Sequence, residues 1–192
     1  QPEQANALDV PATLRLYLPH YSAEEELASD PLALALQEEG ETFALDVRGL
    51  GESIPESQRP FWYAYGVDYQ MHGYYLMLGE SYLGRRVYDV LRTVDLVMGL
   101  GAQEVLLYGR GQGAILALLA AMLDERIAHV TLEGAPASWL EWTETPILDW
   151  PTANTLIGAL PVLDLPDIVA ALGDRVTVHT PWGPRMRPIA EE

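Results

Sequence analysis

The hydrophobic pattern of the chain changes repeatedly between a period of two and a helical period, which predicts strands separated by helices. Five stretches are typical of strands, and they span residues 13–19, 42–47, 104–108, 127–133 and 175–180. Helical patterns lie between them, at residues 22–40, 83–99, 112–123 and 167–172. Because strands that alternate with helices indicate right-handed βαβ units, we predict a parallel sheet.

Local signals mark the ends of two helical regions. Ser22 followed by Glu25 is a capping-box pattern, and Asp30 before a proline predicts a second helix start. Gly40 is a typical C-cap and predicts the end of this region. The helix at 112–123 is apolar on all sides, which predicts that most of its surface is buried.

Two other stretches show neither period. A loop of about 30 residues follows the second strand, and this length suggests a functional role. Its aromatic residues could stack on a sugar as a lid, or could pack as a small cluster of their own. They are Phe61, Trp62, Tyr63, Tyr65, Tyr69, Tyr74 and Tyr75. The second stretch, residues 138–166, is rich in Trp and Pro.

The composition limits the class of protein. With 192 residues, of which 49% are hydrophobic, the chain is long enough for one domain with a sizeable core. The net charge is −17, and all eleven cationic side chains are Arg. So acidic a surface disfavours nucleic acid and anionic membranes as partners, and no apolar run is long enough to cross a bilayer. Cysteine is absent and the four His are isolated, so we expect no metal and no other cofactor.

The most informative motif is GRGQG at residues 109–113, between the third strand and the apolar helix. A strand, a tight turn and a helix form the nucleophile elbow of serine hydrolases, where the middle residue of G-x-S-x-G supplies the attacking hydroxyl. Here that residue is Gly111, which has no side chain. The motif therefore favours a hydrolase fold and argues against ordinary hydrolase chemistry.

Three segments together resemble the α/β-hydrolase superfamily, and within it the acetyl-xylan-esterase-like members. They are DVRGLGES at 46–53, the elbow with its helix at 109–121, and LDLPDIVAAL at 163–172. GRRVYDVLR at 84–92 is similar to the same members. The resemblance implies a three-layer α/β/α sandwich with a mainly parallel sheet of about five strands, ordered 2-1-3-4-5 along the chain.

The same resemblance frames the domain organisation. Residues 12–192 are expected to form one α/β-hydrolase-like domain, preceded by a leader or linker at 1–11. Because the chain begins at Gln1, we expect a processed chain or a part of a longer polypeptide. If the carbohydrate-esterase resemblance holds, its place is outside the cell or in the periplasm.

The chain departs from the family at all three catalytic positions. The resemblance implies the order Ser, acid, His, because the nucleophile needs a base and the base needs an orienting acid. Gly111 stands at the Ser position, and residues 180–185, TPWGPR, carry no carboxylate where the acid is expected. No His follows His179. We therefore expect a degenerate triad.

Two other residues could supply acid–base chemistry. Glu133 ends the fourth strand, and His179 lies near the end of the fifth. Both should lie at the carboxyl edge of the sheet, where open α/β folds bind ligands. The pair could act on water as an acid–base dyad. The alternative is a structural His and a Glu at the rim of the sheet, with no catalytic role.

Ligand-binding residues are expected around the elbow. The backbone N–H of Gln112, at a helix N-terminus, could bind an anion or a carbonyl oxygen. The resemblance implies a second donor after the first strand, where relatives carry His-Gly and this chain carries His20 and Tyr21. Arg110 puts a cation beside the helix N-terminus, which the helix dipole disfavours. We expect Arg110 either to pair with a carboxylate or to hold an anionic ligand.

The same glycines also fit a dinucleotide fingerprint. Gly109, Gly111 and Ala114 match G-x-G-x-x-A after a strand and before a helix. Glu133 follows about 20 residues later, where a ribose-binding acid would lie. Against this, Arg110 makes the loop bulky, and a single further strand leaves the second nucleotide-binding half incomplete.

Three functions remain open from the sequence. The first is a non-catalytic α/β-hydrolase-like domain that binds an ester or carbohydrate ligand, or other domains of the same polypeptide. The second is an active carboxylic-ester hydrolase with displaced or borrowed catalytic residues, and the third is a dinucleotide-binding module. The sequence favours the first, because Gly111 and the other two triad positions lack the groups that catalysis needs.

Overall fold

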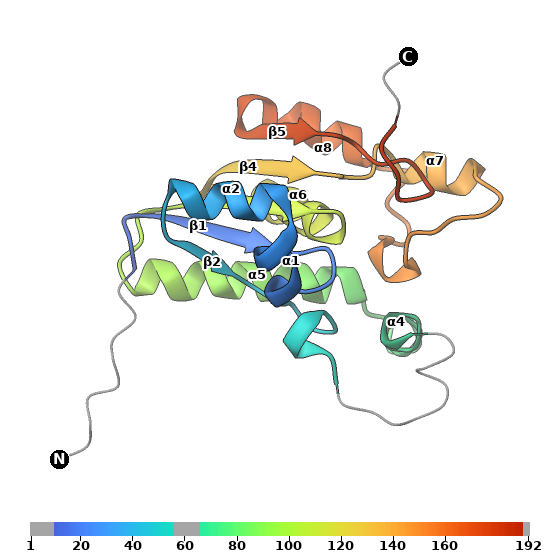
Figure 1. The fold of residues 1–192 in the computed structure, drawn as a ribbon. Helices are drawn as coiled ribbons and strands as arrows, with labels where there is room; N and C mark the ends of the chain where they lie inside the picture. The colour runs from blue at the N-terminus through green and yellow to red at the C-terminus, as the bar shows by residue number, and fades with distance from the viewer. Residues whose placement is uncertain (1–9, 56–65, 190–192) are drawn as a thin grey trace.

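In the computed structural model, which describes residues 10–55 and 66–189, five strands form a single sheet (Figure 1). The strands are β1 (Thr13–Leu18), β2 (Thr42–Ala44), β3 (Glu104–Arg110), β4 (Ile127–Glu133) and β5 (Val176–His179). Their order is β2-β1-β3-β4-β5, and every neighbouring pair is parallel. The predicted strand order and the parallel arrangement are confirmed.

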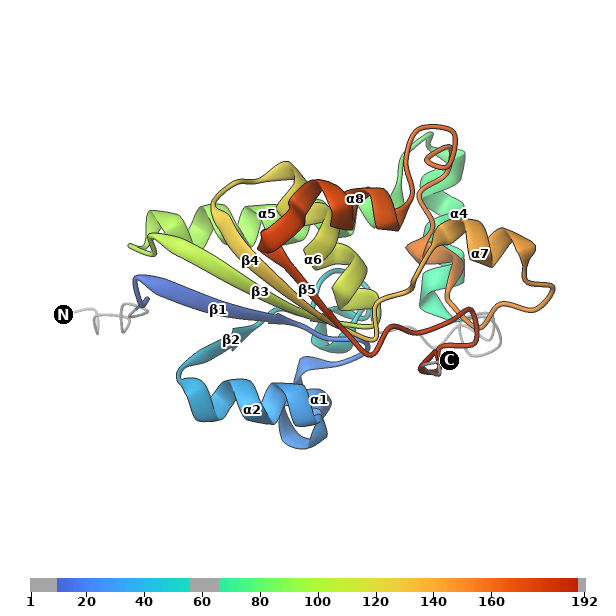
Figure 2. The ribbon, with the colours of Figure 1, turned by 90° about the horizontal axis from the view of Figure 1, so that it is seen from above.

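Helices cover both faces of this sheet, as the predicted three-layer sandwich requires (Figure 2). The helices are α1 (Ala23–Ser29), α2 (Pro31–Glu39), α4 (Val67–Met77), α5 (Tyr82–Gly99), α6 (Gln112–Leu123), α7 (Trp139–Glu144) and α8 (Leu165–Leu172). Figures 1 and 2 show α1 and α2 on one face and α5, α6 and α8 on the other. The helices α4 and α7 lie beyond the carboxyl ends of the strands.

The main core lies between the sheet and the layer of α5, α6 and α8. Alternate residues of the central strands, such as Val105, Leu107, Val130 and Leu132, are fully buried in it. The helix α6 is buried along most of its length, as its uniformly apolar sequence predicts. Among the described residues, no helix combines the length and the apolar character needed to span a membrane.

The predicted ends of the first helical region are confirmed. Ser22 is the N-cap of α1 and accepts a hydrogen bond from the Glu25 N–H. Asp30 is the N-cap of α2, and its Oδ1 accepts from the next two free N–H groups of the helix. Gly40 is the C-cap of α2. The helices α1 and α2 therefore follow β1 in succession and meet at Asp30, the C-cap of the first and the N-cap of the second.

The strand β2 is shorter than predicted, since it ends at Ala44 rather than at residue 47. The carboxylate of Asp46 accepts hydrogen bonds from the backbone N–H groups of Ala23 and Glu52. Leu45 N–H still donates to the Tyr17 carbonyl oxygen of β1 at 3.0 Å, and the bonds of Asp46 hold the turn that follows.

The stretch expected as a long loop contains a 3-10 turn at Gly51–Ser53 and the helix α4. Tyr69, Tyr74 and Tyr75 therefore lie on a helix. The sequence does not reveal this helix, because its apolar residues are spread around its whole circumference instead of forming one stripe. The aromatic residues that lie outside the described part of the chain are Phe61, Trp62, Tyr63 and Tyr65.

The Trp- and Pro-rich stretch contains the short helix α7 and a 3-10 turn at Thr152–Asn154. The helix α8 begins at Leu165 instead of residue 167, because Asp164 and Asp167 form a reciprocal capping box around its first turn. A last 3-10 turn, Gly173–Arg175, connects α8 to β5.

Candidate functional site

The turn from β3 to α6 is built from glycines that leave no room for side chains. A Cβ atom on Gly109 would lie 2.5 Å from the carbonyl oxygen of Gly113, and a Cβ on Gly113 would lie 2.0 Å from that of Leu18. Gly111 has a φ of 53°, in the left-handed region that favours glycine. The elbow is therefore a turn in which close backbone approach requires glycine.

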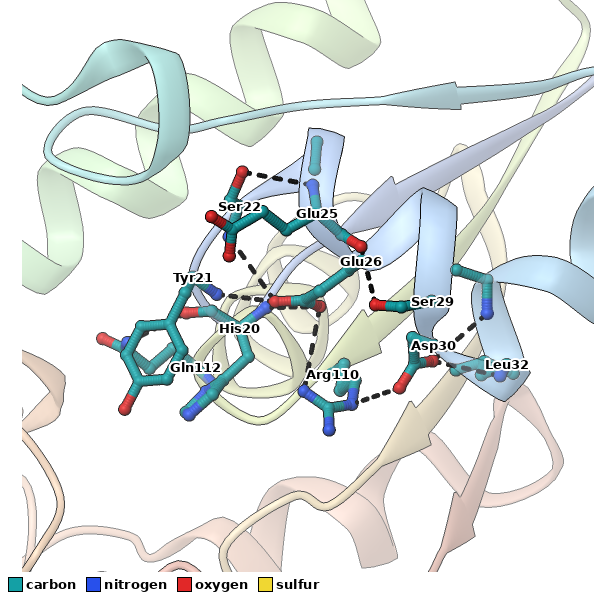
Figure 3. A network of polar contacts seen from close by, with 12 residues as sticks. His20, Tyr21, Ser22, Glu25, Glu26, Ser29, Asp30, Leu32, Arg110 and Gln112 are labelled. Carbon is teal, nitrogen blue, oxygen red and sulfur yellow. Dashed lines mark hydrogen bonds and ion pairs between the residues drawn. The ribbon is translucent and has the colours of Figure 1, made fainter.

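The imidazole of His20 lies against this turn, beside Gln112 (Figure 3). A Cβ on Gly111 would come within 2.2 Å of His20 Nδ1. The backbone N–H of Gln112 donates to the same Nδ1 at 3.0 Å, and its side-chain Nε2 donates to the His20 carbonyl oxygen at 2.9 Å. Gln112 Oε1 in turn accepts from Asn154 Nδ2 at 2.8 Å. The backbone donor that the sequence predicts to be open to a ligand is therefore paired inside the protein.

The environment of His20 keeps the ring uncharged. Burial lowers its pKa to about 4, and the positive charge of Arg110 acts in the same direction. The neutral ring that results accepts at Nδ1 and carries its proton on Nε2. Tyr21, Trp182 and Trp150 surround it, with ring centroids 3.9, 5.3 and 6.1 Å away. Tyr21 is 53% exposed, so it forms the outer wall of this cluster.

Arg110, the last residue of β3, points toward α1 and α2 (Figure 3). Its Nε lies 2.7 Å from Asp30 Oδ2, and its Nη1 lies 3.9 Å from Glu26 Oε2. The guanidinium also lies over the ring of Trp182, 5.2 Å from its centroid. Of the two roles expected for Arg110, the structure shows the pairing with a carboxylate, which offsets the cation beside the helix N-terminus.

Glu26 belongs to the same cluster, and the sequence does not reveal it. The residue is 8% exposed, and its carboxylate accepts from the Tyr17 hydroxyl at 2.8 Å and from the backbone N–H groups of His20 and Tyr21 at 3.0 and 2.7 Å. Burial and the negative charge of Glu26 raise the pKa of Tyr17, so its hydroxyl stays protonated and donates. Residues 24–26 are all Glu, and nothing in the sequence distinguishes the buried one.

Glu133 and His179 occupy paired positions at the carboxyl ends of β4 and β5. Both line a cavity of about 640 Å³, together with Arg110 and Trp182. Glu133 is half-buried and His179 is exposed, and the hydrogen bonds of the described residues include none between the two side chains. Thr180 follows at the cavity wall with a φ of 44°, which is uncommon for a β-branched residue. The geometry therefore brings together the two residues that the sequence suggests as an acid–base pair.

The segment after β5 runs parallel to the residues that follow β4 and forms an isolated bridge with them at Trp182 and Pro136. Trp182 N–H donates to the carbonyl oxygen of Ala135 at 2.9 Å, and a Cβ on Gly134 would meet the Trp182 ring at 2.4 Å. Trp150 Nε1 donates to the carbonyl oxygen of Gly183 at 2.9 Å. Where the resemblance implies a catalytic acid, the chain therefore presents the indole ring of Trp182, which packs against Gly134.

The turn at residues 46–53 serves the fold. Arg48 forms a two-point ion pair with Asp89 of α5, at 2.7 and 2.5 Å, and Ser53 Oγ donates to the Asp46 carbonyl oxygen at 2.8 Å. Arg86, fully buried on α5, donates to the Arg48 carbonyl oxygen at 2.9 Å. In the described part of the chain, no group of three or more His, Asp or Glu side chains could hold a metal ion.

The fold is similar to that of a solved structure from Bacteroides fragilis described as a "putative acetyl xylan esterase". The two chains superpose with a TM-score of 0.68 and are 20% identical, over 93% of this chain and 53% of the other. This chain therefore spans about half the length of that protein. The likeness shows that the chain is an α/β domain with an esterase-like fold. No protein-family model and no curated protein sequence matches the chain.

Proposed function

We propose that the chain is a non-catalytic α/β-hydrolase-like domain with a binding or structural role. The observation that carries this proposal is the contact between His20 and Gly111. The nucleophile position has no hydroxyl, and the space that a side chain would need there is taken by a neutral imidazole. Nucleophilic catalysis at this position would need both a new hydroxyl and a displaced His20.

The surroundings of the elbow support the same proposal. The Gln112 N–H, which could act as an oxyanion donor, is already paired with His20. The segment after β5 presents Trp182 in place of a carboxylate, and its backbone is bonded to the end of β4. The nucleophile, the donor and the acid of an ordinary esterase would thus all have to be rebuilt, which is why we favour a degenerate triad.

We further propose that ligand binding at this edge uses the cavity beside Glu133 and His179. An ester or carbohydrate ligand would find polar groups at these two side chains and an aromatic ring at Trp182. Another domain of the same polypeptide could occupy the same place. The net charge of −17 supports these partners over nucleic acid or an anionic membrane.

A second candidate function is hydrolysis of a carboxylic ester by water, with Glu133 and His179 as the acid–base dyad. It is favoured by one observation, the paired positions of the two residues on neighbouring strands at the wall of the same cavity. The dinucleotide alternative gains no such support. Its phosphate would need free N–H groups at the start of α6, and the first of these, on Gln112, is bonded to His20.

The test is hydrolysis of p-nitrophenyl acetate by the chain and by Gly111→Ser, Glu133→Ala and His179→Ala. We expect no turnover above the uncatalysed rate for the chain, and none for Gly111→Ser, because the acid and the base remain absent from their places. Thermal melting with acetylated xylo-oligosaccharides and with NAD tests binding, since a ligand of the folded state raises the melting temperature.

The possible outcomes separate the candidates. Turnover by the natural chain that Glu133→Ala or His179→Ala abolishes would overturn the non-catalytic proposal and establish the dyad. Turnover that neither substitution reduces would indicate other catalytic residues. Stabilisation by NAD, with none by the oligosaccharide, would favour the dinucleotide-binding module.

A further inference from the structure

A second cavity, of about 430 Å³, lies between α7 and the turns that follow the 3-10 turn at Thr152–Asn154. It shares no lining residue with the cavity beside Glu133 and His179. Trp139 and Trp142 of α7 form its inner wall and are 4% and 5% exposed. Its volume is in the range of sites that hold small molecules.

The outer rim of this cavity is apolar and open to solvent. Ile157 and Leu160 line it and are 65% and 38% exposed. Ile147 and Val162 do not line the cavity, but each is next in the chain to a lining residue, and they are 60% and 81% exposed. Large apolar side chains exposed around a hollow are typical of a binding site. The cavity is therefore accessible, and its rim would gain from burial by a ligand.

The polar groups of the wall decide what kind of ligand fits. The described lining residues include no charged side chain. The two lining hydroxyls already donate within the wall, Thr143 to the Leu140 carbonyl oxygen at 2.8 Å and Thr155 to that of Thr152 at 2.7 Å. Their hydrogens are thus unavailable to a ligand.

The two indole N–H groups of the inner wall differ. Trp139 Nε1 donates to the carbonyl oxygen of Asn154 at 3.1 Å. Trp142 Nε1 is buried and has no hydrogen-bond partner among the described residues. Because an indole N–H can only donate, and a buried donor without a partner is costly, this group needs an acceptor.

We propose that this cavity binds a neutral, mainly apolar molecule with one hydrogen-bond acceptor, such as a ketone or an ester. Its oxygen bonds to Trp142 Nε1 after a small shift of the surrounding wall, since solvent does not reach that nitrogen in the structure. Anions are disfavoured, because the wall supplies no cation and the chain carries a net charge of −17. This site does not depend on the role proposed for the elbow or for the cavity beside Glu133 and His179.

The experiment is a calorimetric titration of the full chain with 2-octanone, with octanoate and with buffer alone. Tryptophan emission is a second readout. The ketone combines an apolar body with one acceptor and cannot be hydrolysed, whereas octanoate has the same length and a negative charge. We expect saturable binding of 2-octanone with a change in emission, because two of the wall residues are Trp. Octanoate should bind at least tenfold more weakly.

Trp142→Phe and Trp139→Phe form a matched pair, since both residues line the same wall. Trp142→Phe removes the unpaired N–H and should weaken 2-octanone binding about fivefold, the worth of a neutral hydrogen bond, without lowering the melting temperature. Trp139→Phe removes an N–H that serves the fold, so it should lower the melting temperature and leave the ketone affinity within about twofold. Ile157→Ser, at the exposed rim, should weaken binding and leave the fold intact.

Four results would overturn the proposal. The first is the absence of saturable 2-octanone binding to the natural chain. The second is equal affinity for the ketone and octanoate, and the third is an unchanged ketone affinity in Trp142→Phe. The fourth is a natural chain that sediments as a dimer and an Ile157→Ser variant that sediments as a monomer, which would mean that a second copy covers the rim.

Discussion

The carboxyl edge of the sheet has two halves that differ in how completely their polar groups are paired. In the half next to β1 and β3, His20, Gln112 and Glu26 are at most 8% exposed and hydrogen-bonded within the cluster. In the half next to β4 and β5, Glu133 is half-buried, His179 is exposed, and both line a cavity. The first half is filled and the second is open.

This difference supports the binding or structural role proposed for the elbow. A reacting group or a ligand needs polar atoms whose hydrogen bonds are not already satisfied within the protein. At the elbow such atoms are already paired, since the backbone N–H of Gln112 bonds to His20 Nδ1 and that of Tyr21 bonds to Glu26 Oε1. A side chain at position 111 would meet the ring of His20, which occupies the adjacent space. Free bonding capacity lies at the other half of the edge.

The strongest test of this comparison is Glu26→Ala. The substitution leaves the Tyr17 hydroxyl and the backbone N–H groups of His20 and Tyr21 without their acceptor. We expect the free energy of unfolding to fall by about 3–5 kcal/mol, since each buried donor left unpaired costs roughly 1–3 kcal/mol. Urea denaturation measures it, with the exposed Glu24→Ala on the same helix as control. Similar losses for both variants would show that the buried hydrogen bonds of Glu26 add no more to stability than an exposed carboxylate does.

Much of the fold could be predicted from the sequence, because local patterns determine its elements. The strand and helix alternation and the apolar character of α6 indicate a parallel sheet with buried helices, and the resemblance supplies its order. The helix α4 could not be predicted, since its apolar residues show no helical stripe and its contacts are tertiary. Its position next to the 3-10 turn at Thr152–Asn154 depends on packing that no local pattern expresses.

The site was harder to predict for a physical reason. The bond between Gln112 and His20 joins residues 92 positions apart, and its effect is to remove a donor that local reasoning expects to be free. Motif reasoning identifies which groups can bind a ligand, but pairing within the fold decides which remain available. Glu133 and His179 could be placed together because strand order alone brings them to one edge.

The second prediction uses pH to probe His20. Its pKa falls from about 6.5 in the unfolded chain to about 4 in the folded one, so below pH 6.5 the unfolded state binds more protons. The stabilisation is therefore complete above pH 6.5 and is lost as the pH falls toward 4. Between pH 7.5 and 5 we expect His20 to account for a loss of about 2 kcal/mol.

The control for this effect is His20→Asn, whose side-chain oxygen can still accept from the Gln112 N–H but does not titrate. Urea midpoints are measured for both proteins at pH 7.5 and pH 5. Titration of the carboxylates changes the stability of both proteins alike, so the difference between them reports His20. The natural chain should lose more stability than the variant. Equal losses of stability in the natural chain and in His20→Asn would show that His20 is open to solvent. The elbow half would then be no more closed than the half at β4 and β5.

The smallest expected effect comes from the open half. Glu133→Ala and His179→Ala remove side chains at a cavity wall, one half-buried and one exposed, so each should change the free energy of unfolding by about 0.5 kcal/mol or less. The comparison with Glu26→Ala is direct, because Glu26 and Glu133 carry the same carboxylate at the same edge of the sheet. Urea denaturation at pH 7.5 measures both. A loss above about 1.5 kcal/mol for Glu133→Ala would exceed the usual range for a surface residue and would mean that this carboxylate also holds the fold together. A negligible loss leaves Glu133 free to contact a ligand, because a side chain that does not stabilise the fold keeps its hydrogen bonds available.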